Sequence, residues 1–157
     1  MAYFQKTINL KKLLLTLGIT VAAGVVSGFI GGASFDGLVK PPLTPPAWIF
    51  PVVWTILYVM MGYAAYRIAT SRSSDRTDAL KSYWLQLGVN ALWTFFFFRL
   101  EWRLFAFFWL LLLLALLVRT IMKFQAIDVI AERFLYPYLA WCGFAAYLNL
   151  AFYLVNR

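Results

Sequence analysis

Residues 40–58, KPPLTPPAWIFPVVWTILY, place two proline pairs directly before an apolar run that is rich in aromatic residues. Proline fixes its φ angle and has no amide hydrogen, so four prolines at positions 41–46 exclude a regular helix there. The first turn of a helix tolerates proline, because its amide hydrogens lack partners within the helix. The stretch therefore predicts a stiff connection that ends where a helix begins, at about Ala47. This connection is either a simple spacer or a preorganised lid over a cavity.

The composition of the whole chain indicates a membrane protein. Apolar residues make up 64% of the 157 positions and charged residues 13%, against about 45–50% and about 25% in soluble domains. Five apolar runs are each close to the roughly 20 residues that a helix needs to cross a bilayer. They cover residues 13–33, 47–66, 83–98, 104–122 and 134–155. We therefore expect an all-α integral membrane protein, with residues 1–157 forming one domain that is a bundle of five transmembrane helices.

Two further expectations concern the segments around these runs. The first run follows several lysines, as in a signal peptide, but it is long and a glycine-rich stretch replaces a clear cleavage site, so we expect a retained helix. The polar segment 70–81 is predicted to be a solvated loop, and residues 34–46 are predicted to form the lid.

The residue types that are missing or rare exclude several kinds of chemistry. The chain has no histidine, which removes histidine-based catalysis, the usual zinc ligand sets and a proximal histidine for haem iron, so no metal site is predicted. Its single cysteine, Cys142, lies in an apolar run and is expected to be a buried, inert thiol. The acidic residues lie outside the interiors of the runs, which argues against proton-coupled export. The basic residues flank the runs, so the predicted partner is lipid and no nucleic acid is expected.

Three segments resemble a known family. KPPLTPPAWIFPVVWTILYVMMGYAAYRI (40–68), NALWTFFFF (90–98) and PYLAWCGFAAYLNL (137–150) are similar, in order and spacing, to the motifs of the TspO/MBR family. These are the tryptophan-rich sensory proteins related to the translocator protein, or peripheral benzodiazepine receptor. The resemblance implies a five-helix bundle, frequently dimeric, that binds porphyrins, sterols and benzodiazepine-like compounds under its first loop. The residues that the resemblance places in this pocket are Phe35, Trp54, Tyr58, Asn90, Trp93, Trp141 and Ala145.

Helical spacing is consistent with a pocket of this kind. Trp54 and Tyr58 are four residues apart, and Asn90 and Trp93 are three apart, so each pair shares a helix face. Trp141, Ala145 and Asn149 repeat every four residues along a third wall. The full predicted ligand-contacting set is Phe35, Pro45, Pro46, Trp48, Trp54, Tyr58, Asn90, Trp93, Trp141, Ala145 and Asn149.

Two alternatives remain open for individual residues of the predicted pocket. Gln86, Asn90 and Thr94 form a polar stripe, and Asn90 either bonds to another helix or contacts a ligand. The two tryptophans, Trp54 and Trp141, either pack within the bundle or line the pocket, and the resemblance favours the pocket.

The glycine face of the first run, at Gly24, Gly28 and Gly32, allows close backbone approach. We expect it to pack within the molecule or to form a thin cavity wall, rather than to form a dimer seam.

The predicted function is a membrane receptor, sensor or translocator for a flat apolar ligand. A porphyrin, protoporphyrin or haem, is the expected ligand, with sterol-like molecules as further candidates, and no cofactor is required. The expected partners are the bilayer and this small molecule, with a second copy in a homodimer as a further candidate. The alternative is an enzyme for light-dependent porphyrin degradation through Trp54 and Trp141. Binding is preferred over catalysis, because no acid–base pair or nucleophile constellation is visible near the predicted pocket.

The distribution of basic residues predicts the topology. With the N-terminus inside, ten of the 14 basic residues fall on the inner side: Lys6, Lys11, Lys12, Arg67, Arg72, Arg76, Lys81, Arg119, Lys123 and Arg133. The outer side holds four: Lys40, Arg99, Arg103 and Arg157. In the plasma (inner) membrane of a bacterium, the positive-inside rule then places the N-terminus in the cytoplasm and the C-terminus outside.

Reporter fusions at the two termini test this topology. We expect a reporter that is active only in the cytoplasm to work at the N-terminus, and one that is active only outside to work at the C-terminus. A cytoplasmic C-terminus would contradict the prediction.

Overall fold

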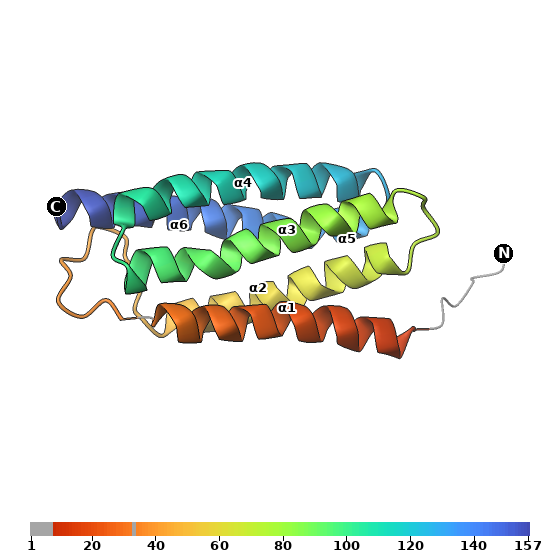
Figure 1. Cartoon of the computed structure of the whole chain (residues 1–157), viewed down its shortest axis with the longest axis horizontal. Helices are drawn as coiled ribbons and strands as arrows, with labels where there is room; N and C mark the ends of the chain where they lie inside the picture. Colours follow the sequence, from red (N-terminus) through yellow and green to blue (C-terminus); the bar gives the residue numbers. More distant parts are fainter. Residues whose placement is uncertain (1–7, 33) are drawn as a thin grey trace.

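The computed structural model describes residues 8–32 and 34–157, which form a bundle of five long helices (Figure 1). The predicted all-α bundle is therefore confirmed. A short helix leads into the last long one, and a π-helical turn extends the third. In chain order the elements are α1 (Leu10–Gly31), α2 (Ile49–Ala69), α3 (Arg76–Thr94), η1 (Phe95–Arg99), α4 (Arg103–Gln125), α5 (Val129–Arg133) and α6 (Tyr136–Val155).

Within the described residues, four helical stretches are long and apolar enough to cross a membrane. They are α1, α2, α4 and the stretch Val129–Val155, which contains α5 and α6. The helix α3 is not among them, and its first two turns carry Arg76, Asp78 and Lys81. It nevertheless runs alongside the other helices (Figure 1) and buries Tyr83, among other residues, in the core.

The start of α3 corrects the prediction that residues 70–81 form a loop. The helix begins at Arg76 instead of at about residue 83, so the loop is limited to residues 70–75. Asp78 lies in the first turn, where a negative charge favours the helix N-terminus. Its carboxylate also accepts a hydrogen bond from Lys123 Nζ of α4 at 2.5 Å. Counting apolar residues misses such a helix end, because its polar residues face away from the hydrocarbon. The bounds of the other four long helices differ from the predicted ones by no more than three residues.

Close contacts at glycine hold α1 against the rest of the bundle. A Cβ atom on Gly62 of α2 would lie 2.9 Å from the Cα atom of Leu17 in α1. A Cβ atom on Gly24 of α1 would lie 2.4 Å from the ring of Tyr58 in α2. Both distances are shorter than real carbon contacts, so α1 and α2 approach each other closely only because these side chains are absent.

The three glycines of the face predicted on α1 differ in their surroundings. Gly24 packs within the molecule, as expected for one of the two favoured alternatives. A Cβ atom on Gly28 would meet no atom within 4 Å, whereas Gly32 has a φ of 65° and ends the helix. The expectation that this face does not form a dimer seam stays a prediction.

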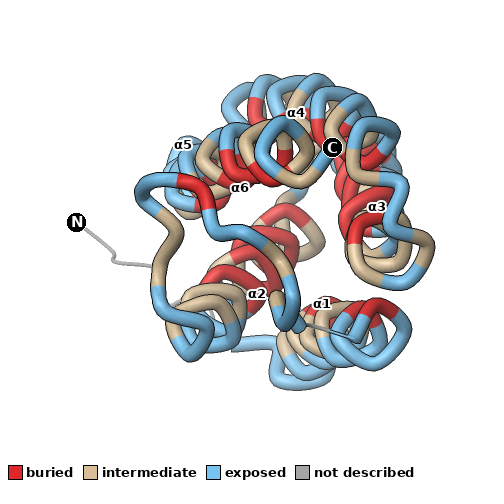
Figure 2. Tube along the Cα trace, turned by 90° about the vertical axis from the view of Figure 1, so that its left-hand side faces the viewer, coloured by how far each residue is buried: buried red, intermediate tan, exposed pale blue. Residues whose placement is uncertain are grey.

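The connection between α1 and α2 crosses one end of the bundle, as seen end-on in Figure 2. Val39 makes two hydrogen bonds with the side chain of Asn156, which follows α6. The backbone amide of Val39 donates to Asn156 Oδ1 at 2.8 Å, and the carbonyl of Val39 accepts from Asn156 Nδ2 at 2.9 Å. The hydroxyl of Tyr147 in α6 donates to the carbonyl of Pro42 at 3.0 Å. The prolines therefore stiffen a connection that reaches across to α6 before it returns to α2.

Replacing Gly62 by Ala is expected to destabilise the bundle. The new methyl group would meet the backbone of α1, which cannot move as a side chain can, and overpacking of this kind costs about 1–3 kcal/mol. The measurement is the thermal unfolding midpoint in a fixed detergent. Gly88→Ala in α3 is the matched control, because its Cβ position is open, and alanine is the better helix former. An equal midpoint for both variants would contradict the close approach of α1 and α2.

Candidate functional site

A cavity of about 370 Å³ lies between α1, α2 and α3, at the end that the connection of residues 34–48 crosses. Its walls are mostly apolar and aromatic. Phe35 of the connection and Ala47 just before α2 contribute to the lining at the loop side. The complete lining is Val21, Gly24, Val25, Ser27, Gly28, Phe35, Ala47, Phe50, Pro51, Trp54, Thr55, Tyr58, Asn90, Trp93, Thr94 and Phe98.

Aromatic rings form the deep wall and the loop-side wall of this cavity. Trp54 and Tyr58, one turn apart on α2, stack with ring centroids 5.6 Å apart and an interplanar angle of 30°. At the loop side, Phe35 packs against Phe50 at 5.3 Å and against Phe98 at 5.2 Å. A flat apolar molecule in the cavity would therefore meet aromatic faces on two sides.

A chain of hydrogen bonds leads from the cavity wall into the core. The Tyr58 hydroxyl donates to Asn90 Oδ1 at 2.5 Å, and Asn90 Nδ2 donates to the Tyr138 hydroxyl at 2.9 Å. The Tyr138 hydroxyl in turn donates to Gln86 Oε1 at 3.0 Å. Asn90 thus joins α2, α3 and α6, and it also lines the cavity. The interhelical hydrogen bond that the sequence allowed for Asn90 is therefore present. The bond to Tyr138 uses one of the two Nδ2 hydrogens of Asn90, so the other is left for a further acceptor.

Two hydroxyl groups at the boundary between α1 and α3 bond to each other. The Thr94 hydroxyl donates to the Ser27 carbonyl at 2.7 Å, and the two hydroxyl oxygens lie 2.9 Å apart. A Cβ atom on Gly31 would lie 2.5 Å from Thr94 Cβ, so α1 meets α3 directly there. These polar groups satisfy each other, and the wall that they form needs no ligand to complete it.

The structure brings five of the predicted contact residues to the cavity lining: Phe35, Trp54, Tyr58, Asn90 and Trp93. The lid prolines Pro45 and Pro46 are not part of the lining, and Trp48 lies just before α2 with 67% of its surface exposed. Ala47 and Phe50, which follow the prolines in the chain, line the cavity instead.

Two predicted residues of α6, Ala145 and Asn149, are buried in the bundle away from this lining. The Asn149 side chain accepts a hydrogen bond from Trp93 Nε1 at 2.9 Å and donates to the Arg103 carbonyl at 2.6 Å. Asn149 therefore joins α3, α4 and α6, and it positions the indole of Trp93, which does line the cavity.

Trp141 lies in a separate groove on the outside of the bundle. Its ring is 5.9 Å from that of Phe50, which lines the cavity, so the two sites are neighbours. The indole Nε1 is buried and has no hydrogen-bond partner within the part of the chain that the structure describes. The groove has a volume of about 510 Å³ and is lined by Val53, Ile56, Leu57, Met60, Pro137, Ala140, Trp141 and Phe144. Contact of Trp141, Ala145 or Asn149 with a ligand stays a prediction.

Several lining residues were not predicted from the sequence, among them Phe50, Phe98, Thr94 and Ser27. Thr94 belongs to the polar stripe of α3, so helical spacing from Asn90 could have placed it in the site. Phe98 lies in η1, where the π-helical turn changes the direction of the side chains relative to α3. No apolar periodicity marks such a turn in a run of four phenylalanines.

Comparison with known proteins agrees with this fold and sequence pattern. The model of the TspO/MBR family matches residues 16–154. The chain is 31% identical to the tryptophan-rich protein TspO of Chlorobaculum tepidum, over 94% of this chain and 99% of the relative. It is 36% identical to the protein CrtK of Rhodobacter capsulatus, over 82% of this chain and 81% of the relative. It is 34% identical to the translocator protein of Homo sapiens, over 85% of this chain and 83% of the relative.

The chain therefore belongs to the TspO/MBR family. The members of this family are bundles of five transmembrane helices, and the chain is a multi-pass integral membrane protein. The apolar length criterion alone leaves out α3, which the family fold includes as a membrane-spanning helix.

Replacing Asn90 by Ala is expected to lower stability even without a ligand. The change leaves the buried hydroxyl of Tyr58 without its acceptor, which costs about 1–3 kcal/mol. The measurement is the unfolding midpoint of the purified protein in detergent. The control is Tyr58→Phe combined with Asn90→Ala: it removes the unpaired hydroxyl, so it should recover part of the loss. A double variant that is as unstable as the sum of both single changes would show that the two groups are not coupled.

Proposed function

We propose that this protein binds a porphyrin, or another flat and largely apolar molecule, in the cavity between α1, α2 and α3, and that it acts as a membrane receptor, sensor or translocator. The observation that carries the proposal is the stacked pair of Trp54 and Tyr58 on the wall of an apolar cavity. The names of two similar proteins, the tryptophan-rich sensory protein of Cereibacter sphaeroides and the translocator protein of Homo sapiens, agree with such a role.

The size and chemistry of the cavity suit a ligand of this class. Its volume of about 370 Å³ lies within the range of roughly 300–1,000 Å³ that is usual for small-molecule sites. None of the described lining residues carries a charge, so the neutral ring system would occupy the cavity. Any carboxylate substituents would remain at the loop side, where they can reach water or headgroups.

The aromatic walls would supply most of the affinity, and the polar groups would orient the ligand. A flat ring bound between Phe35 and the pair of Trp54 and Tyr58 would bury its apolar surface and would also make ring contacts with these residues. The free Nδ2 hydrogen of Asn90 can donate to an acceptor at the edge of the ring. The hydrogen bonds of Asn90 to Tyr58 and Tyr138 hold this amide in one orientation before the ligand arrives.

Titration of the purified protein with protoporphyrin tests the proposal. Saturable quenching of tryptophan fluorescence, together with a shift in porphyrin absorbance, is expected for the wild type. Trp54→Phe keeps an aromatic face, so the affinity should fall by about two- to tenfold, as expected for ring contacts of about 0.5–1.5 kcal/mol. Trp54→Ala should lose more affinity, because the face itself is removed.

The matched control is Trp48→Ala, a tryptophan that lies outside the lining and is exposed. Its porphyrin affinity should equal that of the wild type. Wild-type affinity in Trp54→Ala would remove the cavity from the proposed function, and equal quenching by a size-matched apolar dye would show that binding is not selective.

The same samples test the enzymatic alternative under illumination. Trp54 and Tyr58 place two oxidisable rings in contact on the cavity wall, which favours Trp54 over Trp141 as the residue for light-dependent degradation. A loss of porphyrin absorbance that needs light and disappears in Trp54→Phe, while affinity persists, would assign this reaction to the protein. Equal bleaching in the wild type and in this variant would exclude a role for the Trp54 indole.

A further inference from the structure

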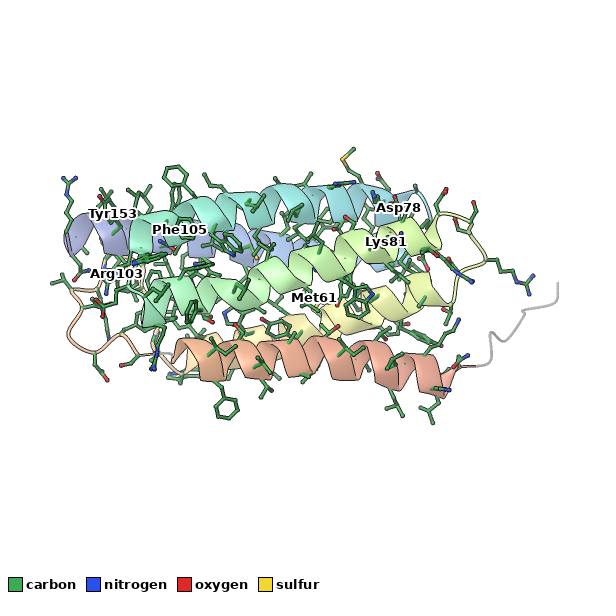
Figure 3. The ribbon with its side chains drawn as sticks, viewed as in Figure 1. Met61, Asp78, Lys81, Arg103, Phe105 and Tyr153 are labelled. Atoms are coloured by element: carbon green, nitrogen blue, oxygen red, sulfur yellow. The ribbon has the colours of Figure 1, made fainter. Side chains whose placement is uncertain are left out.

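A second, smaller cavity lies at the same end of the bundle, between the start of α4 and the end of α6. Its volume is about 250 Å³, and it shares no lining residue with the larger cavity. Figure 3 shows Arg103, Phe105 and Tyr153 close to this end of the two helices. The lining consists of Glu101, Trp102, Arg103, Leu104, Phe105, Tyr153, Asn156 and Arg157.

The charged side chains of this lining favour an anion. The lining contains two arginines, Arg103 and Arg157, and a single acidic residue, Glu101. That carboxylate lies 3.7 Å from Arg103 Nη2, and its side chain is 69% exposed, against 16% for Arg103. Glu101 therefore neutralises Arg103 only weakly, because water screens an exposed partner at this distance.

Arg103 retains an unused hydrogen-bond donor. Its Nε is buried and has no partner among residues 8–32 and 34–157. A buried donor on a cation is costly when it is unpaired, so the described part of the protein leaves the guanidinium of Arg103 incompletely satisfied. The backbone of Arg103 is fixed independently, because its carbonyl accepts from Asn149 Nδ2 at 2.6 Å. The guanidinium is therefore presented from a rigid position.

The start of α4 is not closed by a side chain of the protein. The residue before it, Trp102, makes no side-chain capping bond, and the first turn contains no acidic residue. The Arg103 amide donates to the Glu101 carbonyl at 2.8 Å. The other amide hydrogens at the start of this turn and the positive end of the helix dipole act in the same direction as the two arginines.

The cavity also has an apolar side and lies where two membrane-spanning helices have their ends. The membrane-spanning helix α4 begins here, at Arg103, and α6 ends here, at Val155. Trp102 is 56% exposed, and Trp and Tyr favour the boundary between headgroups and hydrocarbon. Leu104 and Phe105 continue the lining along α4 towards the hydrocarbon. A ligand that fits this arrangement has an anionic head and an apolar tail.

We propose that this cavity binds the phosphate headgroup of a phospholipid. Arg103 and Arg157 contact the phosphate oxygens, since guanidinium groups match phosphate with two parallel hydrogen bonds. The Tyr153 hydroxyl donates to the same headgroup. The first part of an acyl chain packs on Phe105. The bound lipid thereby joins the ends of α4 and α6.

Native mass spectrometry of the full chain in detergent tests this proposal. The probes are dioleoyl phosphatidylglycerol, dioleoylglycerol, which has the same chains without phosphate, and inorganic phosphate. We expect one phosphatidylglycerol molecule to be retained and dioleoylglycerol to be lost. Inorganic phosphate at millimolar concentration should compete weakly or not at all, because it lacks the chains. Displacement by inorganic phosphate alone would show that the site recognises a free anion, and it would overturn the lipid assignment.

Variants at the arginines separate headgroup recognition from general lipid adhesion. Arg103→Gln should weaken retention of phosphatidylglycerol by about tenfold, the loss expected for a charged hydrogen bond, and Arg103→Lys should be intermediate. Arg99→Gln is the matched control, since Arg99 is exposed near the same end but does not line the cavity. Equal loss in Arg99→Gln, or none in Arg103→Gln, would overturn the proposal.

A further variant covers the case in which Arg103→Gln does not fold. Tyr153→Phe keeps the ring and removes only the hydroxyl, and it should reduce retention of phosphatidylglycerol by a few fold while retention of dioleoylglycerol stays at the background. Unchanged retention in both Tyr153→Phe and Arg157→Gln would contradict the site.

Discussion

The structure depends on hydrogen bonds between polar groups inside the bundle, because the surrounding hydrocarbon contains no water that could bind these groups. Asn90 meets this need with one amide that accepts from Tyr58 and donates to Tyr138. These two bonds join three helices at a depth where an unpaired amide would be costly. Asn149 does the same for α3, α4 and α6. Hydrogen bonds therefore act together with close packing to fix the positions of the helices around the cavity, since lipid tails offer apolar contacts equally well.

The cavity between α1, α2 and α3 exists because α1 carries glycines where it faces the other two helices. We call it the larger cavity, in contrast to the smaller one beside α4. Gly24 lets the ring of Tyr58 lie against the helix backbone, and Gly28 leaves open space beside it. The two glycines in this wall leave room for a ligand, while α1 still makes direct contact with α2 at Gly62. Small residues thus contribute both to the packing of the helices and to the volume between them, whereas the aromatic residues define what that volume can recognise.

The sequence predicts the five-helix bundle and much of the cavity wall, because apolar runs and helical spacing are local patterns. The resemblance to the family placed Trp54, Tyr58, Asn90 and Trp93 in the pocket, helical spacing was consistent with it, and all four line the cavity. The predicted start of α3 was wrong, since its first turns are polar and an apolar run does not include them. Trp141 lines an outer groove instead. Helical spacing shows which residues of one helix share a face, but it does not give the rotation of that helix within the bundle, so it could not place Trp141.

The bonds between Val39 and Asn156 couple the first connection to the C-terminal end of the chain. Asn156 holds the connection that crosses the end of the bundle, and it also lines the smaller cavity beside α4. Displacement of Val39 would break both of these hydrogen bonds, while the Asn156 side chain would keep its bond to the Phe152 carbonyl. A ligand in the smaller cavity that contacts Asn156 would therefore be coupled to the position of the connection over the larger cavity. Such a linkage is reciprocal by thermodynamic necessity: a lipid that changed the bonds of Asn156 would change how firmly the connection is held, and the connection would change the affinity for the lipid by the same factor.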